Sequence, residues 1–309
     1  MVFKKNRRCK KRLFLCKGDI YIMQTPPEIK NLISELKKSK KYSQVYPPLL
    51  QRICLEESIK YKKDKEKIKA VKNRLHEAYG AFQNENNLKR AENFISESNG
   101  DLLSLSSLSL NLMKLNTSSN ERILFINDLY KFIFNAIFSD SSDSSDSPEN
   151  TNTTILDIGC GFNPFSLPFI IQAAPEIKIK SYHALDINPA LADITNKYFE
   201  LFNLPKHAGC IDIISEIPVQ KADIAFLFKV IPTIESSKKN RGFEVINNLN
   251  VKYTAISFPT KTLCGKDIGM ANNYSNFFEK KLDYEKFTVI GKNIFENELV
   301  YVLKRLFQG

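Results

Sequence analysis

Residues 155–164 read Ile-Leu-Asp-Ile-Gly-Cys-Gly-Phe-Asn-Pro, a short apolar run that ends in a glycine-rich turn. The pattern predicts a buried strand ending near Asp157, since Gly159 and Gly161 permit a tight turn whose backbone can approach a ligand closely. Pro164 stands where the first turn of a helix accepts proline. Strand, turn and helix in this order are typical of a doubly wound α/β sheet.

After this turn the sequence alternates strands with helices, as expected of such a sheet. The pattern predicts strands at 154–158, 181–187, 209–214, 222–229 and 251–258, with helices near 164–174, 190–203, 233–249 and 269–282. Two further strands, 287–290 and 298–303, follow with no helix between them. A hairpin that closes an otherwise parallel sheet is typical of class I S-adenosylmethionine methyltransferases rather than of nicotinamide enzymes.

The turn itself also favours S-adenosylmethionine over a dinucleotide. A dinucleotide-binding turn would have a third glycine at position 164, and it gives no reason for an acid two residues before the first glycine. With S-adenosylmethionine, the amides of Gly159 and Gly161 would contact the methionine part, and Asp157 would support the turn and the sulfonium end. A lone Gly-x-Gly is a weak signal, so the assignment depends on the acids that follow.

Two more acids stand at the ends of the next two predicted strands. Asp186, with Ile187 beside it, is placed to bond both ribose hydroxyls of an adenosyl group. Asp212 could receive the adenine amino group while Ile213 packs against the ring. An ordinary strand-end turn is the alternative for Asp186.

Charge is distributed unevenly along the 309 residues. Residues 1–100 hold 24 Lys and Arg against 11 Asp and Glu, whereas residues 101–309 hold 21 against 23. Such asymmetry indicates a polyanion-binding domain joined to a near-neutral one, although lysine-rich helices with merely solvated faces would look the same. Apolar residues at helical spacing between 26 and 99 predict that this basic part is a small helical bundle.

Residues 1–22 allow two interpretations. Lys17-Gly18-Asp19 can be encoded by AAA-GGA-GAT, which resembles a bacterial ribosome-binding site, and Met23 follows at a suitable distance. Translation beginning at Met23 would make 1–22 a leader. A genuine disordered basic tail explains the same residues equally well.

Several classes of protein are disfavoured. Six scattered cysteines without a CxxC pair and three distant histidines indicate neither a metal site nor a disulfide framework. No apolar run approaches the ~18–20 residues of a membrane span, and residues 1–22 lack a signal-peptide core. We therefore expect a cytoplasmic, monomeric protein with no metal and no membrane partner.

Seven segments resemble the aminoglycoside-resistance 16S rRNA methyltransferases of the Arm/Rmt/Kgm/Sgm group, and the resemblance extends in order from about residue 23 to the C-terminus. The segments are 116–122 (Asn-Thr-Ser-Ser-Asn-Glu-Arg), 157–164, 182–187, 226–232, 256–263 (Ile-Ser-Phe-Pro-Thr-Lys-Thr-Leu), 265–270 and 297–301. Those at 256–263 and 265–270 are peculiar to that group. Two departures are a longer, more polar stretch at 139–152 and residues 1–22, which have no counterpart.

The resemblance implies that the protein methylates a guanosine N(7) in the decoding A site of 16S rRNA, within the assembled 30S subunit, using S-adenosylmethionine. It implies a basic helical RNA-binding domain at 23–115, where Lys60, Lys62 and Lys63 are predicted RNA contacts. The methyltransferase domain would span 116–309, with a polar linker at 139–153.

In the same family an arginine holds the methionine carboxylate, which assigns that role to Arg122. A structural salt bridge is the alternative, because an arginine that begins a core-facing helix needs an anionic partner in either case.

The expected chemistry needs no catalytic acid or base. Guanine N(7) has an in-plane lone pair on a neutral base, so no residue is expected as general base and catalysis consists of alignment. The target base must leave its stack, which requires an apolar shelf. Phe258 is the candidate, with Ser257 and Lys229 positioning the base, although a phenylalanine at a strand end is often core.

Lys261 and Lys266, near the same sheet edge, are predicted RNA contacts, and each could be merely solvated. Two other functions stay open: a methyltransferase with another target, which would not explain the basic domain, and a noncatalytic RNA-binding protein on this fold. Retention of the acids and glycines of the predicted pocket argues against the second.

Overall fold

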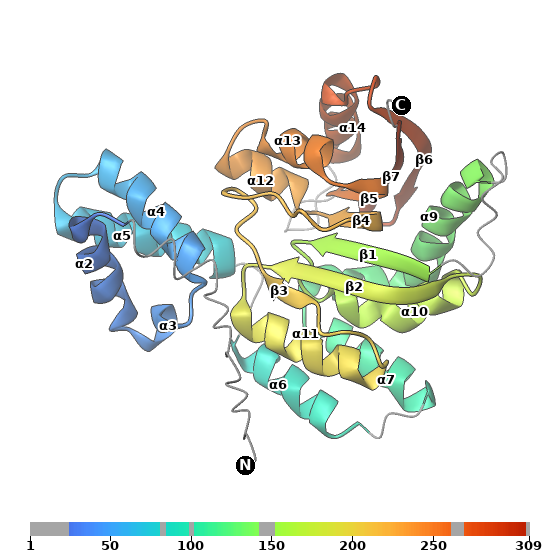
Figure 1. Ribbon diagram of the computed structural model, residues 1–309, viewed down its shortest axis with the longest axis horizontal. Coiled ribbons are helices and arrows are strands. Elements are labelled where there is room, and N and C mark those ends of the chain that lie inside the picture. The colour runs from blue at the N-terminus through green and yellow to red at the C-terminus, as the bar shows by residue number, and fades with distance from the viewer. Residues whose placement is uncertain (1–24, 81–84, 99–101, 142–151, 261–268, 307–309) are drawn as a thin grey trace, which may run out of the picture. The chain divides into compact units, whose positions relative to one another are not determined.

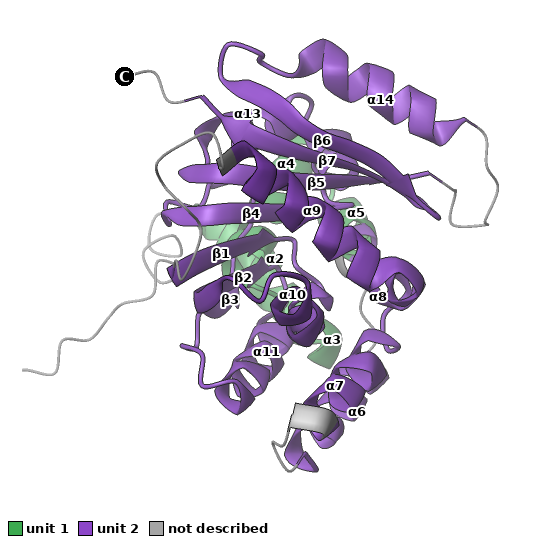
Figure 2. Ribbon diagram, turned by 90° about the vertical axis from the view of Figure 1, so that its right-hand side faces the viewer, with its two compact units in different colours: residues 1–75 green, residues 76–309 purple. Residues whose placement is uncertain are grey.

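The computed structural model describes residues 25–80, 85–98, 102–141, 152–260 and 269–306 (Figure 1). The chain divides into two compact units, residues 1–75 and 76–309 (Figure 2). The described part of unit 1 is helical, with α2 (Pro27–Lys37), α3 (Lys40–Ser43), α4 (Pro47–Lys60) and α5 (Asp64–Leu75). Prolines open α2 and α4, where a missing N–H costs nothing. Its core includes Ile29, Leu32, Leu36, Leu50, Ile53 and Val71.

The division into compact units falls after Leu75 and not near residue 115, and two helices before residue 115 belong to the larger unit. After the short π-helix η1 (His76–Gly80), helices α6 (Glu85–Ser96) and α7 (Leu102–Met113) contribute apolar side chains to the core beside the sheet. The Ser109 hydroxyl of α7 lies 2.7 Å from that of Tyr198 in the same core. A boundary after Leu75 sharpens the charge asymmetry, with 22 basic against 7 acidic residues in unit 1 and 23 against 27 in unit 2.

The sheet of unit 2 has the predicted architecture. In the described part of the chain its order is β3-β2-β1-β4-β5-β7-β6. The strands are β1 (Asn152–Ile158), β2 (Lys178–Asp186), β3 (Ala208–Cys210), β4 (Ala222–Phe228), β5 (Val251–Pro259), β6 (Phe287–Phe295) and β7 (Glu298–Arg305). Neighbours from β3 to β5 pair in parallel, and β7 is antiparallel to both β5 and β6. This confirms a class I methyltransferase sheet with a terminal hairpin.

Helices cover both faces of the sheet (Figure 1). One apolar core joins the sheet to α6, α7, η2 (Ile123–Phe125), α9 (Ile126–Ser141), η3 (Asn163–Ser166), α10 (Leu167–Ala173) and α11 (Pro189–Leu201). The short helix α8 (Thr117–Arg122) precedes η2. The other joins it to α12 (Ile231–Ser237), α13 (Arg241–Asn248) and α14 (Met270–Lys281). Successive residues of a strand point to opposite faces of the sheet, so their side chains pack alternately into one core and the other.

Two predicted elements differ from the structure for local reasons. The helix at 233–249 is two helices, because Asn240 is left-handed with φ 65°. The Glu235 carboxylate accepts hydrogen bonds from the amides of Asn240 and Gly242, which stabilises the break. The predicted strand at 209–214 ends at Cys210. A turn follows, in which the Asp212 carboxylate accepts a hydrogen bond from Ile214 N.

Candidate active site

The loop after β1 is shaped by its two glycines. Gly159 and Gly161 have φ of 62° and 48°, the left-handed region that favours glycine. A Cβ on Gly159 would lie 2.5 Å from the Val230 side chain, whereas one on Gly161 would meet nothing within 4 Å. The amides of Gly159 and Cys160 donate to Leu185 O at the end of β2. The loop is therefore fixed at the carboxyl edge of the sheet and has open space beside Gly161, where a ligand can approach.

Asp157 is buried at the start of this loop, with 1% of its surface exposed. Its carboxylate accepts hydrogen bonds from Asn163 Nδ2 at 2.8 Å and from the Tyr182 hydroxyl at 2.7 Å. Because Asn163 ends the loop, Asp157 joins the two ends of the turn. Burial raises the pKa of Asp157 to about 6, although both hydrogen bonds and the charge of Arg122 oppose this rise.

The raised pKa makes stability depend on pH. The folded protein holds the Asp157 proton more tightly than the unfolded chain does, so stability falls as pH rises from about 4 to about 6. We expect Asp157→Asn, which keeps an acceptor for both donors, to remove this loss of about 3 kcal/mol. Urea unfolding should show the variant gaining on wild type between pH 4 and pH 7. An equal difference in unfolding free energy at both pH values would contradict the assignment.

Asp186, at the end of β2, contacts the glycine loop directly. Its Oδ2 accepts a hydrogen bond from Gly161 N at 3.0 Å, and its Oδ1 accepts from the amides of Ile187 and Asn188. Asn188 in turn caps the N-terminus of α11 through its side chain. The structure thus brings together Gly161, Asp186 and Ile187, three of the residues predicted for cofactor binding.

Asp212 follows β3 and is buried, with 2% exposed. Its carboxylate accepts hydrogen bonds from Ile214 N and from the Ser215 hydroxyl, so part of its role is to close its own turn. Ile213 is also buried, and its carbonyl accepts a hydrogen bond from Arg241. Contact of Asp212 with an adenine amino group stays a prediction.

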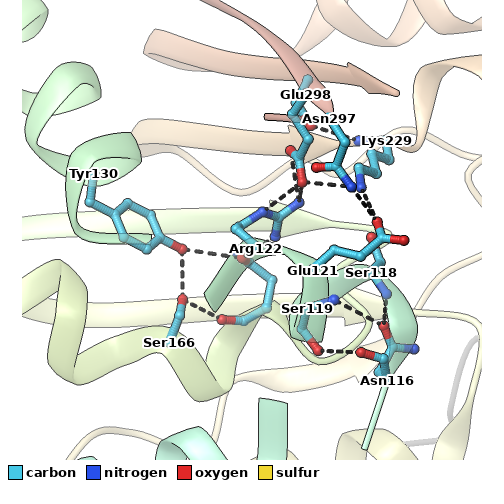
Figure 3. A network of polar contacts seen from close by, with 12 residues as sticks. Asn116, Ser118, Ser119, Glu121, Arg122, Tyr130, Ser166, Lys229, Asn297 and Glu298 are labelled. Atoms are coloured by element: carbon cyan, nitrogen blue, oxygen red, sulfur yellow. Dashed lines mark hydrogen bonds and ion pairs between the residues drawn. The ribbon is translucent and has the colours of Figure 1, made fainter. Parts of the chain in front are cut away.

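Arg122 has its anionic partner inside the protein (Figure 3). Its Nε and Nη2 donate to the two carboxylate oxygens of Glu298 at 3.0 and 3.1 Å, and its Nη1 donates to Asn163 Oδ1 at 2.8 Å. Both charged side chains are almost fully buried, and the guanidinium also lies 4.7 Å from the Phe228 ring centroid. The structural salt bridge that was the alternative for Arg122 is therefore present, with Glu298 as its partner. Contact of Arg122 with a methionine carboxylate stays a prediction.

Lys229 directly follows β4, and contacts of both its backbone and its side chain fix its position. Its φ of 56° is left-handed, and its amide donates to the carbonyl and the hydroxyl of Ser257. Its Nζ lies 3.1 Å from Glu121 and 3.2 Å from Glu298. Burial disfavours the charge of Glu298, but Arg122 and Lys229 outweigh it, and the pKa of Glu298 is below its usual value.

Phe258, the predicted shelf for the target base, and Ser257, predicted to position that base, both face the interior. The Phe258 side chain is fully buried, with its ring against those of Tyr274, Phe278 and Tyr301. At its position in β5 the side chain faces the core under α14, so no face is left for a nucleobase. Ser257 is also fully buried, and its hydroxyl accepts a hydrogen bond from the Lys229 amide.

The predicted RNA-contacting lysines fall into two groups. Lys60 ends α4, and Lys62 and Lys63 lie between α4 and α5 in unit 1. All three are exposed, and Lys60 Nζ also lies 2.7 Å from Glu57. Lys261 and Lys266 lie outside the described residues.

Sequence reasoning missed the two residues that organise the interior of the site, Asn163 and Glu298. Glu298 had a usable signal, because it is an acid at the start of an apolar strand and a buried carboxylate requires a cation. Asn163 had none, since an asparagine in a turn usually serves its own backbone. Its bridging position between Asp157 and Arg122 depends on the tertiary fold.

The described residues contain neither a metal-binding cluster nor a membrane-spanning helix. No cluster of three or more His, Cys, Asp or Glu side chains there could hold a metal ion. No helix there is long and apolar enough to cross a membrane.

Known proteins are similar to this chain over nearly their whole length. The family described as ribosomal RNA methyltransferase (FmrO) matches residues 38–302. A 16S rRNA (guanine(1405)-N(7))-methyltransferase of Serratia marcescens is 30% identical over 277 residues, 90% of this chain and 98% of that protein.

Two solved structures give the same result. The 16S rRNA methylase RmtB has a TM-score of 0.71 and 26% identity, with 91% of this chain and 100% of that one covered. The 16S rRNA methyltransferase RmtF in complex with S-adenosyl-L-homocysteine has a TM-score of 0.74 and 25% identity, with 91% and 99% covered. The chain therefore belongs to the FmrO family of ribosomal RNA methyltransferases.

Proposed function

We propose that the protein methylates N7 of G1405 in the decoding A site of 16S rRNA, using S-adenosylmethionine, and thereby confers aminoglycoside resistance. Supporting this is the full-length similarity to a 16S rRNA (guanine(1405)-N(7))-methyltransferase, together with the geometry of the glycine loop. One observation carries the proposal. Asp186 accepts a hydrogen bond from Gly161 N in the loop, and the space beside Gly161 is open.

The residues at this edge fit S-adenosylmethionine. Asp186 can accept hydroxyl donors from a ribose, and the turn around Gly159 and Gly161 allows close backbone approach. Ile187, Asp212 and Ile213 are proposed to hold the adenine. When bound, the cofactor supplies a methyl group made electrophilic by its sulfonium. Since guanine N7 needs no deprotonation, the chain's task is to bind and orient, with water kept out.

The substrate is proposed to be the assembled 30S subunit, approached by the protein as a monomer in the cytoplasm. Unit 1 carries an excess of 15 positive charges, and phosphate neutralisation supplies much of the affinity of such surfaces for RNA. Unit 2 has a slight excess of acids, so its net charge does not favour binding to RNA in the same way. A methyltransferase acting on a small molecule would not need unit 1, which favours the ribosomal substrate.

Cofactor affinity tests the assignment of Asp186. We expect Asp186→Asn to weaken S-adenosylmethionine binding by roughly 10- to 100-fold, because a charge-assisted hydrogen bond contributes about 1.5–3 kcal/mol. Calorimetry on the folded variant measures this directly. Asp193→Asn, on the exposed side of the adjacent helix α11, is the matched control and should bind like wild type. An Asp186→Asn affinity within about twofold of wild type would remove the ribose assignment.

A further inference from the structure

One buried carboxylate, that of Glu298, connects three elements at the carboxyl edge of the sheet. We call Glu121, Arg122, Lys229, Asn297 and Glu298 the Glu298 network (Figure 3). Glu298 is fully buried at the start of β7 and contacts Arg122 from α8 and Lys229 from the end of β4. Around it, Glu121 accepts from both Lys229 and Asn297 at 3.1 and 2.7 Å. The network balances two cations with two carboxylates.

The network reaches the glycine loop on one side. Arg122 Nη1 donates to Asn163 Oδ1, and Asn163 Nδ2 donates to Asp157, so a continuous chain of polar contacts runs from Glu298 to the end of β1. The Tyr130 hydroxyl also reaches Asn163, at 3.1 Å. Movement of Glu298 would therefore be transmitted to the loop that is proposed to hold the cofactor.

On the other side the network reaches the ends of β4 and β5. Lys229 is tied to Ser257 by its amide, and the next residue, Val230, packs against Gly159 so closely that a Cβ on that glycine would lie 2.5 Å away. A left-handed lysine costs about 1 kcal/mol and persists only when its surroundings impose it. Here the amide bonds to Ser257 and the ion pairs of Nζ hold the conformation.

We propose that Glu298 is a positioning residue, which fixes the glycine loop and the segment after β4 relative to each other so that methyl donor and target base align. The proposal rests on the proposed function, in which alignment is the main source of catalysis. Stability alone does not call for these charges, since a buried ion pair is often no more stable than an apolar replacement. What an ion pair of this geometry does supply is a fixed direction for both cations.

The test is single-turnover methylation of 30S subunits by Glu298→Gln with both substrates saturating. The amide nitrogen of glutamine would face the donors of Arg122 and Lys229, so the network loosens. We expect the rate to fall about 100-fold, the cost of misplacing reacting groups by about 1 Å, while the dissociation constants for S-adenosylmethionine and 30S change less than about threefold. Asp140→Asn is the matched control, because it removes a carboxylate that ties the same strand, through Lys304, to α9 at the opposite end of the sheet.

A folded Glu298→Gln protein with a wild-type rate would overturn the proposal, as would a loss confined to cofactor affinity. If that variant does not fold, Glu121→Gln decides, since it frees one partner of Lys229 at a half-exposed position and leaves the buried pair intact. A rate about fivefold lower with unchanged affinities would support the proposal, and a wild-type rate would overturn it. Wild-type protein that does not methylate 30S at all would instead refute the proposed function.

Discussion

Expression of the protein in a susceptible bacterium should raise resistance to gentamicin and kanamycin and leave apramycin effective. The reason is that N7 methylation blocks an acceptor and fixes a positive charge on the guanine edge that these cationic drugs bond. Losing a charge-assisted hydrogen bond costs about 1.5–3 kcal/mol, and repulsion between two charges about 4 Å apart adds roughly 1–4 kcal/mol. Together these amount to about 2.5–7 kcal/mol, a loss of drug affinity of roughly 70-fold or more. Inhibitory concentrations of the three drugs measure the effect.

The control for this prediction is the Asp186→Asn variant, expressed at the same level, which should protect less. Resistance that includes apramycin would indicate methylation of a neighbouring adenosine instead. No resistance from folded protein that binds S-adenosylmethionine would leave an RNA methyltransferase with a different target.

Replacement of Lys60, Lys62 and Lys63 by glutamate should separate RNA binding from cofactor binding. These side chains are exposed between α4 and α5, in the unit that carries the positive charge. If they neutralise three phosphates, the slope of log affinity for 30S against log salt should fall by about 3, and affinity near physiological salt should drop roughly 100-fold. Filter binding across a salt series checks both values, while S-adenosylmethionine affinity should stay unchanged.

A control with the same charge change keeps this test specific. Lys178, Lys180 and Lys221 are exposed at or just before the amino ends of β2 and β4, away from the proposed site. Their replacement by glutamate should lower 30S affinity only slightly. Equal losses from both triple variants would mean that net charge, and not the surface between α4 and α5, governs binding.

The sheet was predictable from sequence because its signals are local. Alternating apolar strands, the turn at 157–164 and two strands without a helix between them specify a parallel sheet with a terminal hairpin. The domain boundary was not predictable in the same way. Helix α6 has an amphipathic pattern like that of α2, and α7 is rich in leucine and serine. Tertiary packing, such as Ser109 against Tyr198, assigns both helices to unit 2.

The site shows the same division. Asp157 and Asp186 follow from their positions at strand ends, and the structure places both against the glycine loop. Phe258 illustrates the limit, because strand alternation cannot tell whether a ring at a strand end meets solvent or, as here, a covering helix. For Arg122 the sequence shows that a partner is needed, but its partner, Glu298, lies 176 residues away and is brought near only by folding.

The most direct test of the proposed function is to map methylated nucleotides in 16S rRNA from 30S subunits treated with the purified protein and S-adenosylmethionine. Mass spectrometry of nuclease fragments, with chemical cleavage at N7-methylguanosine, identifies both the nucleotide and the atom. We predict a single new methyl group on N7 of G1405, absent when the Asp186→Asn variant is used at limiting cofactor. A methyl group on any other atom or nucleotide, or none with folded, cofactor-binding protein, would contradict it.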